Sequence, residues 1–206
     1  PPPLLRRQRQ MCIRDSNDVV YIADTYGRKV KSLTLTGQCK DIWFTGQYPH
    51  AIAANSNYVF VGHPSNNISI LDHRLNQRTT RSINSNYLSY SWGMSINPAG
   101  NRLAIADYNK NHVVEFSISG DWLAYTQKTS STYSSGNGYF QRPTDTGYDI
   151  SGNIYVSDLY GHRVQKFNSS LVYQSKVGSY STSSGFRYPY GCLLYTSDAA
   201  DEEAWG

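Results

Sequence analysis

Two residue types that can bind a metal or move a proton recur along the chain. The aspartates are Asp24, Asp107 and Asp158, and the histidines are His63, His112 and His162. Neutral imidazoles that converge from several repeats could bind a divalent ion such as zinc or calcium. The first chemical hypothesis is therefore a metal site built from the three histidines.

A structural role explains the same residues. Each aspartate follows a short apolar run, and an aspartate at the end of a strand commonly accepts backbone N–H groups from the next turn. A residue that recurs in every repeat serves the repeat, whereas a catalytic residue is usually unique. We therefore predict that Asp24, Asp107 and Asp158 hold loops, and that the histidines pack beneath them.

The elements that position these residues are repeats. Clear copies of one pattern occupy residues 21–33, 104–116 and 155–167, and a shorter copy at 60–71 has His63 in the place of the aspartate. The marker positions 24, 63, 107 and 158 are 39, 44 and 51 residues apart. Repeats of about 40–50 residues made of short strands are typical of a β-propeller.

Each repeat reads as four short strands rich in Val, Ile, Tyr, Phe and Thr. The expected inner strands are 50–54, 93–97 and 144–149, and the expected outer strands are 40–44, 78–83, 122–126 and 171–176. Turns rich in Asn and Gly separate them. The sequence predicts an all-β propeller made of four-stranded antiparallel blades.

Residues 152–158 and 161–167, read together, resemble the NHL repeat, and the chain is similar to NHL-repeat propellers over about residues 17–191. A glycine-rich link followed by Phe140-x-x-Pro143 precedes this copy, and residues 178–191 repeat the link. Asp145 stands where the family usually has glycine. The resemblance implies a ring of six blades.

The copies do not fill such a ring. We expect three complete blades at about 47–83, 90–127 and 140–177, a partial blade at 17–46, and one leading strand from Tyr190. Residues 1–16 and 192–206 resemble translated adapter sequence, so they are predicted to be non-native tails and are excluded from the fold. The prediction is an incomplete arc of a larger propeller.

Composition excludes several classes of protein. The chain carries a formal net charge of +4, which is mildly basic and not that of a polycation. Cys39 is the single cysteine between residues 17 and 191, so no disulfide is expected within that region. No apolar run reaches the ~18 residues of a membrane span. Its 18 tyrosines and its many Ser and Asn residues favour an extracellular or periplasmic location.

Catalytic signatures are sparse. No Gly-x-Ser-x-Gly segment with a suitable His and acid occurs, and Glu115 is the single glutamate between residues 17 and 191. The chain also resembles amidating-lyase and lactonase-like propellers, which implies a metal-dependent lyase or hydrolase as the alternative function. We predict a non-enzymatic recognition scaffold with no cofactor.

The predicted binding surface is one face of the propeller, here called the loop face, formed by residues 24–29, 63–67, 107–112, 128–142, 158–163 and 177–189. Basic and aromatic side chains gather in these segments. The candidate contact residues are Arg28, Tyr108, Lys110, Arg142, Tyr160 and Arg163. They suit a protein, peptide or glycan partner. Single-stranded RNA is a second alternative, because cations attract phosphates and aromatic rings stack on bases.

Overall fold

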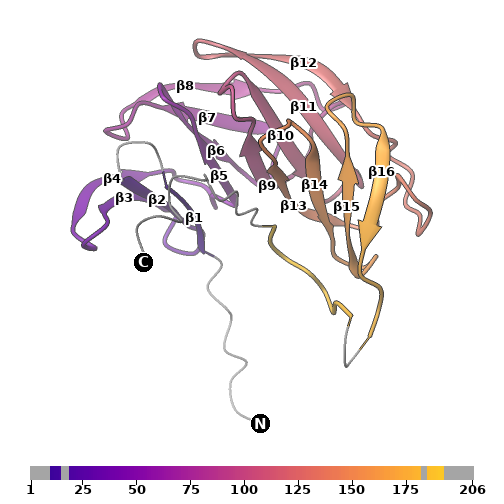
Figure 1. The fold of residues 1–206 in the computed structure, drawn as a ribbon. Coiled ribbons are helices and arrows are strands. Elements are labelled where there is room, and N and C mark those ends of the chain that lie inside the picture. The colour runs from indigo at the N-terminus through magenta and orange to yellow at the C-terminus, as the bar shows by residue number, and fades with distance from the viewer. Residues whose placement is uncertain (1–9, 15–18, 182–184, 193–206) are drawn as a thin grey trace, which may run out of the picture.

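Residues 10–14, 19–181 and 185–192 are described in a computed structural model of the 206-residue chain. This part of the chain forms four separate four-stranded antiparallel sheets and contains no helix (Figure 1). None of these residues therefore lies in a helix long and apolar enough to cross a membrane. The prediction of an all-β propeller with four-stranded blades is confirmed.

The four sheets follow one another along the chain, and each is one blade. Blade 1 consists of β1 (Gln10–Arg14), β2 (Val19–Asp24), β3 (Lys29–Thr34) and β4 (Cys39–Phe44). Blade 2 consists of β5 (Ala51–Ala54), β6 (Val59–Gly62), β7 (Asn67–Leu71) and β8 (Gln77–Ser82). Blade 3 consists of β9 (Ser91–Ile96), β10 (Arg102–Asp107), β11 (His112–Ser119) and β12 (Trp122–Lys128). Blade 4 consists of β13 (Pro143–Tyr148), β14 (Ile154–Asp158), β15 (Arg163–Phe167) and β16 (Tyr173–Val177).

The blades fan out side by side in an arc that does not close (Figure 1). The first two strands of blade 1 contact β5, β5 and β6 contact β9, and β9 and β10 contact β13. In every blade the pairing of the third and fourth strands contains one register shift. Such a β-bulge bends a strand and increases its twist, which suits a blade whose outer edge turns away from the axis.

The first blade differs from its prediction. The sequence analysis gave it no inner strand, but β1 pairs antiparallel with β2, with Gln10 opposite Asp24 and Arg14 opposite Val20. This strand comes from the segment that was excluded as a non-native tail, because that segment resembles translated adapter sequence. The described residues therefore form four complete blades, while the origin of residues 1–16 and 192–206 stays a prediction.

The leading strand expected from Tyr190 is not assigned as a strand. Residues 190–192 nevertheless lie against the inner edge of blade 4, where Ser157 Oγ donates to the carbonyl of Gly191 at 3.0 Å. The backbone N–H of Cys192 donates to Asp145 Oδ2 at 2.9 Å. Cys192 and Cys39 are free thiols. Residues 193–206 lie outside the described residues.

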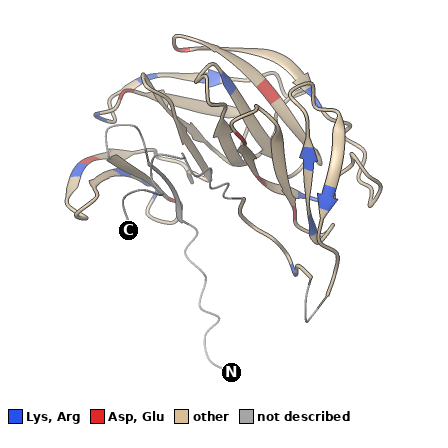
Figure 2. Ribbon diagram, viewed as in Figure 1, with Lys and Arg blue, Asp and Glu red and all other residues tan. Residues whose placement is uncertain are grey.

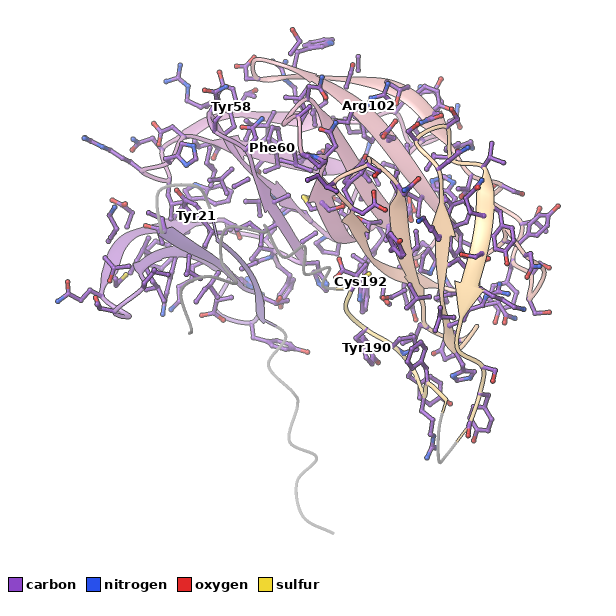
Figure 3. The ribbon with its side chains drawn as sticks, viewed as in Figure 1. Tyr21, Tyr58, Phe60, Arg102, Tyr190 and Cys192 are labelled. Carbon is purple, nitrogen blue, oxygen red and sulfur yellow. The ribbon has the colours of Figure 1, made fainter. Side chains whose placement is uncertain are left out.

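The hydrophobic core lies between the blades and has three layers. Tyr21 and Val61 belong to the layer between blades 1 and 2, and Phe60 belongs to the layer between blades 2 and 3 (Figure 3). Phe140 and Phe167 belong to the layer between blades 3 and 4, with their ring centroids 5.4 Å apart. Each blade therefore buries its apolar side chains against its neighbour, as expected for repeats that cannot form a core alone.

The inner strands approach closely near the axis. A Cβ atom added to Gly93 would lie 2.5 Å from the carbonyl oxygen of Thr144 and 2.6 Å from the Cα of Asp145. These contacts are with backbone atoms, which cannot move aside as a flexible side chain can. Glycine is therefore required at this position so that blades 3 and 4 can meet.

Glu115 joins blades 3 and 4 by hydrogen bonds. Its carboxylate is buried, accepts a hydrogen bond from the hydroxyl of Tyr148 at 2.7 Å, and pairs with Arg102 at 2.7 Å. Gln127 also donates to it, at 2.7 Å. Burial, together with the negative charge of Glu115, raises the pKa of Tyr148, so its hydroxyl stays a donor. The single glutamate of the repeats is structural.

We expect Glu115→Ala to lower the free energy of unfolding by about 3 kcal/mol, because it leaves several buried donors without an acceptor. Asp121→Ala is the control, since the Asp121 carboxylate pairs with Arg81 but is 46% exposed. That change should cost less than about 1 kcal/mol. Urea unfolding followed by circular dichroism measures both, and equal losses would contradict the interpretation.

Candidate functional site

The three predicted aspartates end the second strands of their blades and face a basic residue across the hairpin. Asp24 lies opposite Lys29, Asp107 opposite His112, and Asp158 opposite Arg163. The corresponding N···O distances are 3.8, 3.9 and 2.9 Å. We call each such pair a loop clamp.

The turn inside each loop clamp has one shape. The fourth residue after each aspartate has a positive φ: 50° at Arg28, 54° at Asn111 and 52° at His162. The aspartate accepts backbone N–H groups from this turn; for example, Asp24 Oδ1 accepts that of Gly27 and Asp107 Oδ1 that of Lys110, both at 3.0 Å. A side-chain acceptor of this kind stabilises a tight turn.

In blade 3 the loop clamp also binds the link that leads into the blade. Asp107 is buried and accepts the backbone N–H of Ser89 at 2.6 Å. His112 Nε2 donates to the carbonyl of Tyr87 at 2.9 Å. Burial lowers the pKa of His112, although the nearby charge of Asp107 opposes this shift. Its imidazole is therefore neutral, and it satisfies a link carbonyl.

Blade 4 repeats this arrangement with a stronger donor. Asp158 Oδ1 accepts the backbone N–H of Gln141 at 2.7 Å, and Arg163 donates to the carbonyl of Tyr139 at 2.8 Å. Arg163 also donates to the carbonyls of Ser135 and Gly136, at 2.7 and 2.9 Å. Burial raises the pKa of Asp158, while Gln141 and Arg163 act in the opposite direction. Arg163 is 4% exposed and is committed to the link, so it does not present the contact surface predicted for it.

The three histidines do not meet at one point. His112 lies five residues after its aspartate, where blade 4 has Arg163, whereas His162 lies four residues after Asp158. His162 Nδ1 accepts the backbone N–H of Tyr188 at 3.2 Å. His112 and His162 are therefore one residue apart in the repeat, and each binds a different partner. The described residues contain no group of three or more metal-ligating side chains, so these histidines do not fit a shared zinc or calcium ion.

His63 takes the aspartate position in blade 2 but acts differently. Its imidazole is buried, and its Nε2 shares a hydrogen bond with Ser69 Oγ at 2.9 Å. The ring of Trp43 from blade 1 contacts it edge-on, with the centroids 6.4 Å apart. Burial lowers the pKa of His63 to about 4. This histidine is a neutral packing group between two blades.

A row of rings crosses the loop face, and we call it the aromatic band. It consists of His50, Tyr90, Trp92, Tyr108, Tyr160 and Tyr188. Trp92 stacks on Tyr108 with the centroids 4.4 Å apart and the planes 19° apart. Burial and a hydrogen bond with Tyr160 raise the pKa of Tyr108. Tyr160 meets Tyr188 edge-on at 5.8 Å, so the band spans blades 2, 3 and 4 and the link that follows.

Three predicted contact residues come together here. Tyr108 and Tyr160 belong to the aromatic band, and the guanidinium of Arg142 lies over the Tyr108 ring, 4.8 Å from its centroid. Lys110 shares the turn of Tyr108. Arg28 belongs to blade 1, where its guanidinium lies 4.5 Å from the ring centroid of Tyr48.

The other members of the aromatic band were not among the candidate contact residues. His50 and Tyr90 directly precede the inner strands β5 and β9, and Trp92 is the second residue of β9. Tyr188 directly precedes Pro189, just as Arg142 precedes Pro143, and both residues have a positive φ. The residues at the start of each inner strand therefore lie at the loop face, and their position in the repeat could have identified them as candidates.

Comparison with known proteins identifies the repeat. Residues 140–167 match the family model of the NHL repeat, a segment that includes the loop clamp of blade 4. No curated protein matches the sequence.

Two solved structures share the fold. Virginiamycin B lyase from Staphylococcus aureus superposes with a TM-score of 0.62 at 13% identity, covering 79% of this chain and 53% of that chain. Hydrazine synthase from Kuenenia stuttgartiensis superposes with a TM-score of 0.61 at 13% identity, covering 77% and 45%. This chain thus spans about half the length of either structure, and at this identity the likeness shows the fold alone.

We expect Arg163→Ala to lower the free energy of unfolding by about 3–5 kcal/mol, because it leaves the buried Asp158 carboxylate unpaired. Arg28→Ala removes an exposed cation over a ring and should cost about 1 kcal/mol or less. Urea unfolding measures both, and amide hydrogen exchange at Gln141 should become faster in Arg163→Ala alone. If the two variants lost the same stability, the loop clamp would not hold the link.

Stability should also depend on His63 and pH. Since its pKa is about 4 in the folded chain and about 6.5 when unfolded, the unfolded chain binds more protons between these values, and stability falls as the pH drops below about 6.5. From pH 7 to pH 4.5 this residue should remove on the order of 2 kcal/mol. Urea titrations of the wild type and His63→Gln measure the difference. Parallel pH profiles would contradict the prediction.

Proposed function

From the premise of an NHL repeat within a β-propeller, we propose that this chain is a non-enzymatic recognition scaffold that binds a protein, peptide or glycan partner through its loop face. The observation that supports this most is the aromatic band. Tyr160 and Tyr188 are 44% and 42% exposed although they lie in a packed row of rings. Exposed tyrosines on a rigid scaffold offer a large contact area at a low entropic cost.

The acidic and imidazole side chains that could catalyse a reaction are buried and already hydrogen-bonded, which favours a binding function over an enzymatic one. Asp107 and Asp158 are buried, and their carboxylates already accept backbone N–H groups. His112 is buried and neutral, and its Nε2 donates to a carbonyl. A general acid or base must reach the substrate proton directly or through one water. These groups instead act on the backbone of their own loops.

A metal-dependent lyase or hydrolase is the alternative function. Both structural neighbours are named as enzymes, but their identity to this chain is 13%. The histidines that would hold the ion bind Ser69, Tyr87 and Tyr188, in separate places. This separation favours the scaffold.

Binding of single-stranded RNA is less favoured, because three cations of the loop face are already engaged within the protein. Arg163 is buried, and Lys29 pairs with Asp24 at 3.8 Å. Arg142 donates to the carbonyl of Tyr108 at 3.1 Å. Figure 2 shows the charged residues spread over several blades rather than gathered in one patch. An RNA surface would instead need several phosphate contacts.

A binding panel tests the proposal on the full chain. Immobilised oligosaccharides, peptides and single-stranded RNA are probed with the wild type, with Tyr108→Ala, and with Trp122→Ala as the control on an outer strand, where Trp122 is 56% exposed. We expect one class to bind, with the affinity reduced about tenfold in Tyr108→Ala and unchanged in Trp122→Ala, because a lost stacking contact costs about 1–3 kcal/mol.

Two outcomes would overturn the proposal. One is that no class binds, or that binding is equally strong in Tyr108→Ala. The other is stoichiometric zinc or calcium in the purified chain that is lost in His112→Ala, which would favour the metal-dependent enzyme.

A further inference from the structure

We propose that the aromatic band binds an uncharged oligosaccharide, with the exposed rings of Tyr160 and Tyr188 as its stacking platforms. This inference rests on the proposed function and names the ligand class of the same face. A sugar ring has a face of C–H groups and a rim of hydroxyls. It therefore needs an aromatic surface that is bordered by neutral hydrogen-bonding groups, and the aromatic band has both.

The rings are fixed in position before any ligand arrives. Trp92 packs between Tyr90, at 5.3 Å, and Tyr108, at 4.4 Å between ring centroids. Tyr108 in turn lies close enough to Tyr160 for the two phenol groups to interact. Each ring holds the next, so a ligand need not immobilise free side chains. Preorganisation of this kind lowers the entropic cost of binding, which matters for weakly held ligands such as sugars.

The exposed end of the aromatic band lies beside blade 4. Tyr160 and Tyr188 are each more than two-fifths exposed, at 44% and 42%, whereas Trp92 is only partly exposed. Tyr190, labelled in Figure 3, is 57% exposed and lies near enough to influence Tyr108 electrostatically. These tyrosines supply ring faces and hydroxyl groups on one surface. The arrangement offers stacking and hydrogen bonding to one ligand.

The charges near the aromatic band disfavour a cationic ligand. The Arg142 guanidinium lies over Tyr108 and donates to the carbonyl of Tyr108 and to Asn109 Oδ1, at 3.1 and 3.4 Å. The carboxylates of Asp107 and Asp158 are buried beneath the loops. A cationic ligand could therefore not reach these carboxylates, and it would also meet the positive charges of Lys110, in the turn of Tyr108, and of Arg187, next to Tyr188. A neutral glycan needs no charged partner, so its binding does not depend on these groups.

The backbone of the loops argues against a peptide as the main ligand. Peptides that bind in extended form use main-chain hydrogen bonds. Around the aromatic band several main-chain N–H groups are already paired; for example, Asp107 takes the N–H groups of Ser89 and Lys110. In blade 4, Asp158 takes that of Gln141. Recognition here must come from side chains, which suits a sugar ring better than a peptide backbone.

Isothermal titration of the full chain with cellohexaose, laminarihexaose and chitohexaose tests the inference. At least one sugar should bind, and Tyr160→Ala and Tyr188→Ala should each raise its Kd by about tenfold. Trp122→Ala is the control, because Trp122 is 56% exposed but lies on the outer strand β12, outside the loop face. Its Kd should stay within about twofold of the wild type. The bound sugar should also change the tryptophan fluorescence, and Trp92→Phe should abolish that change.

The outcomes separate this inference from the proposed function. If none of the three sugars binds but a peptide or RNA does, and Tyr160→Ala weakens it, the glycan class is overturned and the scaffold stands. If a sugar binds equally well in Tyr160→Ala and Tyr188→Ala, the aromatic band is not its site and the inference fails. If no ligand of any class depends on these tyrosines, both proposals fail. Circular dichroism melts of each variant confirm that the fold is intact.

Discussion

The loop clamp is the interaction on which the loop face depends. Links between blades are irregular segments, and their buried N–H and C=O groups need partners that no sheet provides. In blade 3, Asp107 accepts an N–H group of the link and His112 donates to a carbonyl two residues earlier. In blade 4, Asp158 and Arg163 do the same. Two side chains at the end of one hairpin thus supply the hydrogen bonds that a neighbouring strand would otherwise provide.

The loop clamp also determines where the aromatic band lies. Tyr108 and Tyr160 are the first and second residues after their aspartates, inside turns whose shape the carboxylates fix. A shift in such a turn would move Tyr108 away from Trp92, which is anchored on β9. The aromatic band is therefore no more rigid than the loop clamps below it. Structural aspartates and exposed tyrosines form one unit.

The features that recur in every repeat could be predicted from the sequence, whereas the features that differ between repeats could not. Four strands per blade and the loop aspartates followed from a period and a spacing. Neither reveals whether a basic residue turns inward, so Arg163 was placed on the surface although its guanidinium is buried. His112 and His162 lie five and four residues after their aspartates, so an ungapped comparison of the repeats already shows that they are one residue apart. The aromatic band joins segments far apart in the chain, which only the fold brings together.

Blade 2 supports this account of the loop clamp, because it has no such pair. Its link from β4 to β5 is six residues long, against eight before β9 and fourteen before β13. The side-chain donors increase in the same order. The imidazole of His63 bonds Ser69 inside its own blade, that of His112 reaches one link carbonyl, and Arg163 reaches three. A longer link buries more unpaired backbone, so it needs a residue with more N–H groups to hold it.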